Sequence, residues 1–487
     1  MGAPLALSRP DLLREAALVG GLWLDATGTR VDVANPAQGG LVGRVPRTGV
    51  AEARTAIDAA VQAQPAWAAR TAKERAAVLR RWHDLILQHR EDLAQILTAE
   101  QGKPLAEARA EVTFGASFLE WFAEEGRRAY GETIPSPSAD RHLLTIRRPV
   151  GVCAAITPWN FPNAMLARKV APALAVGCAM VVKPAEQTPF SALALAVLAI
   201  EAGVPAGVLS VLTSDRSGAA EVGTEVATHP AVRLLSFTGS TAVGKLLARQ
   251  SADTVKKLAL ELGGNAPFIV FDDADLDVAL DALMLAKFRN AGQTCVSANR
   301  ILLQAGIHDA FVERLAARIE ALCVGDGREP GTDIGPLIDA RAVQKVGVHV
   351  ADALNQGATR RVGRDTHPRG GNFYSPTLLT GVTPAMRVFR EETFGPVAAV
   401  GRFDTEAEAV ALANSGEAGL AGYFFTRDLS RTLRLGNALD YGMLGINTAA
   451  ISTPEAPFGG VKESGLGREG GHQGLDEYLE SRYLCIA

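Results

Sequence analysis

Apolar residues recur at helical spacing along the first quarter of the chain. Leu79, Trp82 and Ile86 follow one another at intervals of three and four positions among charged residues, which predicts one buried helix face. Two short strand-like runs lie nearer the N-terminus. We expect helices over residues 50–64, 73–102 and 105–126, and strands over residues 21–23 and 31–35.

From residue 142 onward, short apolar runs alternate with longer helical patterns. Strands are expected over residues 142–148, 152–156, 179–183, 208–212 and 233–237. Helices are expected over residues 164–176, 190–202, 218–228 and 242–251. This alternation is typical of an α/β fold with a parallel, doubly wound sheet, whose ligand binds at the C-terminal ends of the strands.

A second alternation begins near Lys256. Its strands are expected over residues 257–260, 268–271, 301–304 and 398–403, and its helices over residues 276–288 and 309–321. Residues 365–374 are rich in Gly, Arg and His and predict a surface loop. The tail, residues 476–486, is extended and apolar, and a terminal strand usually needs a partner. We therefore expect the tail to pair with another subunit.

Composition narrows the class of protein. A chain of 487 residues with a net charge of −4 has room for two to four domains and lacks the basic footprint of a nucleic-acid partner. Its five cysteines form neither a CxxC pair nor a Cys/His cluster, so disulfides and a metal site are not expected. No secretory signal is recognisable, and the apolar run at 190–200 is too short to cross a membrane. A cytoplasmic protein without membrane contact is expected.

Three segments could bind a nucleotide. In one, Lys183 and Glu186 at the end of a predicted strand could hydrogen-bond a ribose, or both could be solvated loop charges. The other two imitate known motifs. The literal G-x-G-x-x-G at 465–470 follows no predicted strand and leaves too little chain for a βαβ unit, so we discard it. Residues 239–246 nearly match a P-loop between a strand and a helix, and Asp272 imitates its magnesium-binding acid. A P-loop NTPase is thus a rival, but Leu246 replaces the hydroxyl that such a loop places on the metal. The turn would still accept a pyrophosphate at the helix N-terminus.

One carboxylate and one thiol stand out beside glycines. Glu261 opens Glu-Leu-Gly-Gly-Asn, and Cys295 closes Gly-Gln-Thr-Cys, 34 positions later. Such a pair supplies a base and a nucleophile for covalent chemistry on a carbonyl, in a place where glycines let the backbone approach a ligand. The alternative for an isolated Cys is a small buried hydrophobe.

Seven short motifs follow one another along the chain. They are TPWNFP at 157–162, KPAE at 183–186, FTGST at 237–241, ELGGN at 261–265, GQTC at 292–295, EETFGP at 391–396 and PFGG at 457–460. In this order they give the chain a resemblance to the aldehyde dehydrogenase superfamily over essentially its full length. Within it, the runs 286–295 and 464–470 most resemble succinate-semialdehyde dehydrogenases, with glutarate-semialdehyde dehydrogenases as near neighbours.

The resemblance implies the catalytic roles. Cys295 is the expected nucleophile and Glu261 the general base that activates water. Asn160 and the Cys295 backbone N–H are the expected donors to the oxyanion. Alternatively, Asn160 is an ordinary turn residue.

The resemblance also implies the binding residues. NAD is expected over NADP, because the Glu186 carboxylate suits ribose hydroxyls and repels a 2′-phosphate. The carboxylate of a semialdehyde acid would be held by Arg168 and Arg289, assisted by Ser452. Alternatively, Arg168 is a surface residue in a salt bridge. The expected cofactor-binding residues are Thr157, Trp159, Lys183, Glu186, Gly239, Ser240, Gly244, Leu262, Glu392 and Phe394.

By resemblance, the chain divides into three parts. A Rossmann-like NAD-binding domain comprises residues 1–135 and 150–258, and an α/β catalytic domain comprises residues 259–455. A small β bridging element comprises residues 136–149 and 470–487, and implies a homodimer or homotetramer. The expected function is NAD-dependent oxidation of succinic semialdehyde, with glutaric semialdehyde as the alternative. A P-loop NTPase and a catalytically inactive binding homologue remain alternatives of another class.

Overall fold

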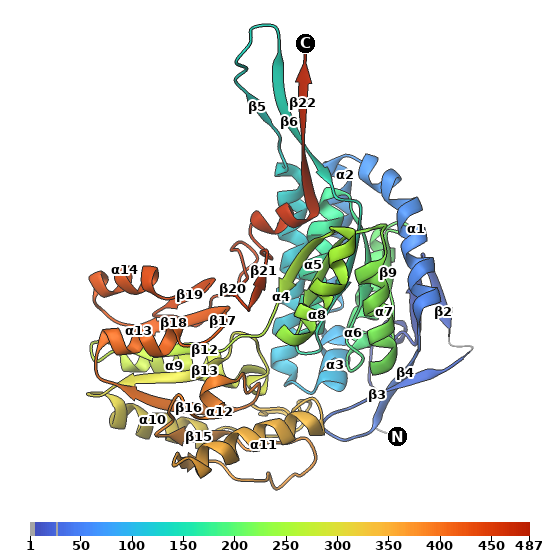
Figure 1. Cartoon of the computed structure of the whole chain (residues 1–487). Coiled ribbons are helices and arrows are strands. Elements are labelled where there is room, and N and C mark those ends of the chain that lie inside the picture. Colours follow the sequence, from blue (N-terminus) through green and yellow to red (C-terminus); the bar gives the residue numbers. More distant parts are fainter. Residues whose placement is uncertain (1–4, 26–27) are drawn as a thin grey trace.

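The computed structural model describes residues 5–25 and 28–487. Two large, mainly parallel sheets lie beside each other, each covered by helices, and a small antiparallel sheet projects away from both (Figure 1). This arrangement confirms the predicted α/β class with two α/β bodies and a β element. No helix in the described ranges is long and apolar enough to cross a membrane.

The first sheet has a reversal of strand order at its centre. Its parallel strands stand in the order β9 (Leu209–Val211), β8 (Ala179–Lys183), β7 (Val152–Ile156), β10 (Val232–Thr238) and β11 (Lys257–Glu261). The chain thus proceeds outward from β7 in one direction and from β10 in the other. Ligands of doubly wound sheets bind where this reversal occurs. The antiparallel edge strands are β1 (Ala16–Val19), β2 (Leu22–Asp25) and β21 (Gly465–Leu466).

Both faces of this sheet are buried. Cys153 and Ala155 of β7 pack into the core beneath one helical layer, whereas Val152 and Ala154 pack into the core beneath the other. Successive strand residues point to opposite faces, so the continuous apolar run of β7 serves two cores. The first layer contains α2 (Ala72–Gln88), α3 (Arg90–Gln101), α4 (Leu105–Glu125), α5 (Pro162–Val176) and α6 (Pro189–Ala202), and the second contains α1 (Val50–Ala69), α7 (Arg216–Thr228) and α8 (Thr241–Ser251).

The second sheet carries its own hydrophobic core. Its strand order is β14 (Thr359–Val362), β15 (Thr377–Thr380), β16 (Val397–Phe403), β13 (Ala298–Gln304), β12 (Ala266–Val270), β18 (Ala421–Phe425) and β19 (Met443–Ile446). All neighbours except β14 and β15 pair in parallel. The helices that follow its strands are α9 (Leu276–Phe288), α10 (His308–Glu320), α11 (Ala340–Asn355), α12 (Arg387–Arg390), α13 (Glu406–Asn414) and α14 (Leu429–Ala438).

The predicted start of the second alternation and the predicted single helix over residues 73–102 were wrong. The strand expected to open the second alternation is β11, which pairs in parallel with β10 in the first sheet. The second alternation therefore begins at β12. The helical stretch 73–102 is two helices, because His89 (φ −103°, ψ 20°) leaves helical geometry between α2 and α3.

The sheet topology excludes a βαβ dinucleotide motif for the G-x-G-x-x-G run at 465–470 and a P-loop NTPase site for the turn at 239–246. Gly465 and Leu466 form β21, antiparallel to β11, so the G-x-G-x-x-G run follows no strand of a βαβ unit. The P-loop-like turn follows β10, whereas Asp272 follows β12 in the other sheet. A metal-binding acid and a phosphate loop would need to share one sheet edge, so the NTPase interpretation fails.

The projecting sheet contains the C-terminal strand. Here β22 (Leu479–Ile486) pairs antiparallel with β6 (His142–Pro149), which also pairs with β5 (Glu132–Ile134) (Figure 1). The tail therefore has a partner within its own chain, and its pairing with another subunit stays a prediction for the second edge of β22. The domain boundaries likewise stay predictions. A separate hairpin is formed by β3 (Arg30–Ala34) and β4 (Leu41–Pro46), and β17 (Ala418–Gly419) pairs with β20 (Val461–Lys462).

Candidate active site

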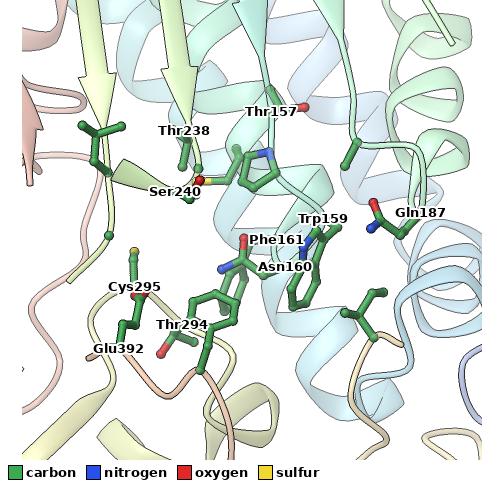
Figure 2. A pocket seen from close by; sticks show the side chains of 18 of the residues that line it. Thr157, Trp159, Asn160, Phe161, Gln187, Thr238, Ser240, Thr294, Cys295 and Glu392 are labelled. Carbon is green, nitrogen blue, oxygen red and sulfur yellow. The ribbon is translucent and has the colours of Figure 1, made fainter. Parts of the chain in front are cut away.

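One cavity of about 930 Å³ gathers most of the predicted site residues. Its walls come from the C-terminal ends of β7, β8 and β10, from the Cys295 loop and from the start of α11. Cys295 and Glu392 lie on one side of it and Gln187 on the other, with Asn160 and Trp159 between them (Figure 2). The predicted residues on its wall are Thr157, Trp159, Asn160, Arg168, Lys183, Glu186, Gly239, Ser240, Leu262, Arg289, Cys295, Glu392, Phe394 and Ser452.

Two predicted residues lie just behind the cavity wall of the described chain. Gly244 is inside α8, and a Cβ there would lie 2.4 Å from a methyl carbon of Leu262. Its lack of a side chain thus makes room for Leu262, which does line the cavity. Glu261 ends β11 with 4% of its surface exposed, one residue before Leu262.

A left-handed turn presents Cys295. The 3-10 turn η4 (Arg289–Gly292) follows α9, and Asn290, Ala291 and Gly292 have φ of 52°, 55° and 72°. A Cβ on Gly292 would lie 2.2 Å from the carbonyl oxygen of Gly395. Only glycine combines this φ with this approach. The glycine of the Gly-Gln-Thr-Cys motif is therefore required by the backbone conformation, whereas the cysteine is required by the expected chemistry.

Gly264 brings the segment that begins at Glu261 against the Cys295 segment. A Cβ at Gly264 would lie 2.1 Å from the Cys295 carbonyl oxygen. Burial raises the pKa of Glu261 well above its usual range; the charge of Glu469 adds to this, and Arg168 and other cations oppose it. Oε1 of Glu261 has no hydrogen-bond partner among residues 5–25 and 28–487. The carboxyl is therefore poised to hold a proton.

The thiol of Cys295 is also held in its protonated form. Burial raises the pKa of Cys295 above its usual range, and the charges of Glu261 and Glu392 raise it further. Arg168 and Arg289 act in the opposite direction. The two arginines are thus the local groups that favour the nucleophilic thiolate.

Asn160 joins the two catalytic segments. Its Nδ2 donates to the Gln293 carbonyl oxygen at 3.0 Å, and its side chain turns toward the side of the cavity that holds Cys295 (Figure 2). Its own carbonyl oxygen accepts from Lys103 Nζ at 2.8 Å and from Asn290 Nδ2 at 3.0 Å. One amide hydrogen of Asn160 thus remains for a ligand beside the thiol.

The two arginines differ in their partners. Arg289 is half-buried, stands 5.4 Å from the centroid of Phe161, and has no carboxylate within ion-pair distance in the part of the chain that the structure describes. Arg168 is 3% exposed, 4.2 Å from the ring centroid of Phe458, and 3.7 Å from Glu469. The interpretation of Arg168 as a surface residue is therefore wrong. Nε of each arginine lacks a hydrogen bond within the described ranges.

The other side of the cavity offers polar groups suited to a dinucleotide. The Nζ of Lys183 lies 3.7 Å from Oε2 of Glu186. The hydroxyls of Thr157 and Thr238 are buried and have no partner in the described chain. Such orphaned donors fit the hydroxyls and phosphates of a nucleotide. Exposed Arg216 also lines this side.

Glu392 and Phe394 lie on the Cys295 side. Glu392 accepts from the Gly264 N–H at 3.2 Å, and burial raises its pKa to about 7. The Phe394 ring stands 5.5 Å from that of Trp159 in an edge-to-face contact. No three His, Cys, Asp or Glu side chains gather as a metal site in the described ranges.

Sequence reasoning missed several residues that contact the predicted ones. Lys103, Glu107 and Glu111 lie beneath Asn160 and Arg289, and Glu469 contacts Arg168. The spacing of Phe114, Phe118 and Phe122 predicts a helix face. It gave no sign that Phe114 and Phe118 stand within 5.7 and 4.9 Å of the Arg168 guanidinium.

Comparisons with known proteins agree with these motifs and this geometry. The chain is 57% identical to succinate-semialdehyde dehydrogenase NADP(+) of Escherichia coli, over 99% of this chain and 100% of that protein. It is 57% identical to the 3-sulfolactaldehyde dehydrogenase of Pseudomonas putida, with 99% of both covered. The crystal structure of succinate-semialdehyde dehydrogenase from Burkholderia pseudomallei superposes with a TM-score of 0.98 at 56% identity, covering 99% of this chain and 100% of that one.

The family-level match spans nearly the whole chain. The pattern of the aldehyde dehydrogenase family matches residues 23–484. This match confirms the resemblance that the seven motifs indicated. It also places both sheets and the projecting strands within one family fold. The protein is an oxidoreductase, and it belongs to the aldehyde dehydrogenase family.

Proposed function

We propose that the enzyme oxidises a short aldehyde that carries a distal acid group, with succinic semialdehyde as the substrate and NAD as the hydride acceptor. The observation that carries this proposal is Arg289. Its guanidinium lines the same cavity as Cys295 and is not ion-paired within the described chain. A half-buried cation without a partner is well suited to an anionic ligand. Arg168 and Ser452 lie on the same wall.

The relatives support an anionic substrate. One is named for a semialdehyde acid and another for a sulfonated aldehyde. The two names share an acidic group apart from the aldehyde, which matches a cavity with two arginines. Glutaric semialdehyde is the second candidate, because one additional methylene changes binding by only about 1–3 kcal/mol.

The proposed chemistry begins at Cys295. Its thiol gives up its proton to water, the thiolate adds to the aldehyde carbon, and the oxyanion of the resulting thiohemiacetal accepts from Asn160 Nδ2 and the Cys295 backbone N–H. NAD held in this cavity would supply the hydride acceptor needed to convert that adduct into a thioester on Cys295. Glu261 would then remove a proton from the water that attacks the thioester, and cleavage of the C–S bond would release the acid and return Cys295 as the thiolate. The raised pKa of Glu261 makes the carboxylate a stronger base once it has lost its proton.

NAD is proposed over NADP because of the pair formed by Lys183 and Glu186. Its separation of 3.7 Å lets the carboxylate offset the cation that would otherwise attract a 2′-phosphate. The relative named for NADP(+) and the neighbouring Arg216 support the opposite choice. We further expect a homodimer or homotetramer in the cytoplasm.

The test compares kcat/KM for succinic, glutaric and uncharged aldehydes, with NAD and with NADP, in the wild type and in Cys295→Ala. We expect the highest value for succinic semialdehyde with NAD and no turnover in the variant. A preference for the uncharged aldehyde would reject the acid substrate. Turnover by Cys295→Ala would reject the nucleophile.

A further inference from the structure

A fully buried ion pair lies beneath the turn that carries Asn160. The side chains of Lys103 and Glu111 are 0% and 1% exposed and are in contact. Lys103 Nζ also donates to the Asn160 carbonyl oxygen at 2.8 Å and stands 3.9 Å from the centroid of the Phe161 ring. Lys103 precedes α4 and Glu111 lies within it, far from the catalytic motifs in sequence.

Glu111 holds the other end of the same turn. Its Oε1 accepts from the backbone N–H groups of Asn163 at 3.0 Å and Ala164 at 3.3 Å. These are free N–H groups in the first turn of α5, whose cap residue Phe161 makes no side-chain hydrogen bond in the described chain. A carboxylate from α4 thus replaces the missing cap, where the helix dipole also favours a negative charge.

The network continues into the loop before Cys295. Glu107, one turn before Glu111 on α4, accepts from the Asn290 N–H at 2.8 Å. The Gln101 side chain donates to Asn290 Oδ1 at 2.9 Å, and Asn290 Nδ2 donates to Gln293 O at 3.3 Å. Asn290 Nδ2 and Lys103 Nζ therefore converge on the same carbonyl, that of Asn160. The left-handed turn and the Asn160 turn are thus joined at this carbonyl oxygen, in addition to the bond from Asn160 Nδ2 to the Gln293 carbonyl oxygen.

We propose that Lys103 and Glu111 are positioning residues that set the Asn160 amide against Cys295 for the developing oxyanion. The inference rests on the proposed role of Asn160. Oxyanion donors are effective only when they are held in place before reaction, and small displacements lower the rate steeply. A buried ion pair stabilises a fold weakly compared with apolar residues of similar volume. Its contacts here are directed at backbone atoms of the Asn160 turn, which is what positioning requires.

The first test is a double-mutant cycle between Lys103→Met and Asn160→Ala. Lys103→Met should lower kcat about 10- to 100-fold, while KM for the aldehyde changes less than about threefold, since loss of one oxyanion donor costs about 10²–10³ in kcat. In the Asn160→Ala background, Lys103→Met should cost less than about twofold. Glu111→Gln, which can still accept the two N–H bonds, should lose less activity than Lys103→Met.

Two further variants separate positioning from folding. Lys103→Met/Glu111→Gln removes both buried charges but keeps an acceptor for the N–H groups of Asn163 and Ala164, so it should recover the thermal stability lost in Lys103→Met, while kcat stays low. The matched control is Lys256→Met. Lys256 is also buried and donates to two backbone carbonyls, at 3.1 and 3.0 Å, but lies off the cavity. This control should lower Tm and leave kcat within about twofold of wild type.

The possible failures are distinct. A full 10- to 100-fold loss from Lys103→Met in the Asn160→Ala background would overturn the positioning role alone. Recovery of kcat together with Tm in Lys103→Met/Glu111→Gln would overturn it as well. Wild-type kcat in Asn160→Ala would overturn the proposed oxyanion donor, and this inference with it. Alkylation of Cys295 by iodoacetamide at the wild-type rate in Lys103→Met would support an intact thiol and a displaced donor.

Discussion

The two sides of the cavity each present a cation, but only one of these cations is paired with a carboxylate. On the side proposed to bind the coenzyme, Lys183 lies 3.7 Å from Glu186. On the Cys295 side, Arg289 has no ion-pair partner in the described ranges. Both sides of the cavity therefore hold a basic side chain, but a nearby carboxylate offsets the positive charge on only one of them.

This difference links local charge balance to ligand choice. A cation that already has a carboxylate offers hydrogen bonds to neutral hydroxyls, whereas a cation without one favours an anion. Arg168 is intermediate, because Glu469 lies 3.7 Å away and three phenylalanine rings surround its guanidinium. Within the proposed function, Arg289 is therefore the expected main contact with the acid group of the substrate.

The largest expected effect comes from removing the unpaired cation. Arg289→Ala should lower kcat/KM for succinic semialdehyde about 30- to 4,000-fold. This factor corresponds to the loss of about 2–5 kcal/mol of interaction energy with the substrate. An uncharged aldehyde of similar length should lose less than about threefold when it is assayed above the acid limb of the pH–rate profile, where the effect of Arg289 on the pKa of Cys295 does not limit the rate. Steady-state NADH formation with both aldehydes measures the difference.

Arg341 provides a matched control for this prediction. It lines the same cavity but is paired with Asp339 at 2.7 Å. Arg341→Ala should change kcat/KM for either aldehyde by less than about twofold, because an exposed ion pair contributes little. Equal losses on charged and uncharged aldehydes in Arg289→Ala would contradict the comparison.

The second prediction removes the carboxylate from the paired side. Glu186→Ser should raise kcat/KM for NADP about tenfold, because it removes the repulsion between the Glu186 carboxylate and the 2′-phosphate. A tenfold change corresponds to about 1.4 kcal/mol. Glu186→Gln keeps hydrogen-bonding groups without the charge and should show part of the gain. Adding Arg216→Ala to Glu186→Ser should reduce the gain, because Arg216 lines that side of the cavity. An unchanged NADP preference in Glu186→Ser would reject Glu186 as the selecting residue.

The third prediction concerns pH. Arg168 lowers the pKa of both Glu261 and Cys295 against the effect of burial. Arg168→Met should therefore move the acid limb of the pH–rate profile to higher pH, by up to about one unit. An uncharged aldehyde is the right substrate, because it removes the contribution of substrate binding. A shift to lower pH would contradict the assigned direction.

The sequence predicted local structure well where one pattern decides it. Both β7 and β8 match their predicted bounds, because apolar runs between glycine or proline signals indicate buried strands. It misplaced β11, because its partner strand β10 is chosen by packing across the sheet. It missed β18 and β19, whose short apolar runs are interrupted by Gly422 and Gly445 but complete the second core.

The residues of the candidate site also fall into two groups, those found in local sequence motifs and those brought to the site only by tertiary packing. Cys295, Asn160 and Arg289 stand in motifs and could be named from sequence. Lys103 and Glu111 contact Asn160 and α5 only because α4 packs on α5. Their sequence separation from Asn160 exceeds any periodic pattern, so no local signal could have indicated them. The same is true of Glu469, which reaches Arg168 from the C-terminal segment.

The smallest expected effect concerns a third cation, Lys287. It has no hydrogen-bond partner in the described chain and does not line the active-site cavity. This residue of α9 is 0% exposed. Burial lowers its pKa to about 7, opposed by the charge of Glu392. Between pH 7 and the ordinary lysine pKa, the unfolded chain binds a proton that the folded chain lacks, so this group makes stability rise with pH across that window.

Lys287→Met removes this dependence. The variant should melt about 2–5 °C above wild type at pH 7, and this gain should shrink toward pH 10, where the lysine is largely neutral in both states. Exposed Lys245, paired with Glu463, is the control, and Lys245→Met should change Tm by less than about 1 °C at either pH. A gain of equal size at both pH values would mean that packing, and not the buried ammonium, limits stability. A pH-dependent gain would show that an unpaired cation is costly where no ligand can reach it, in contrast to Arg289 beside Cys295.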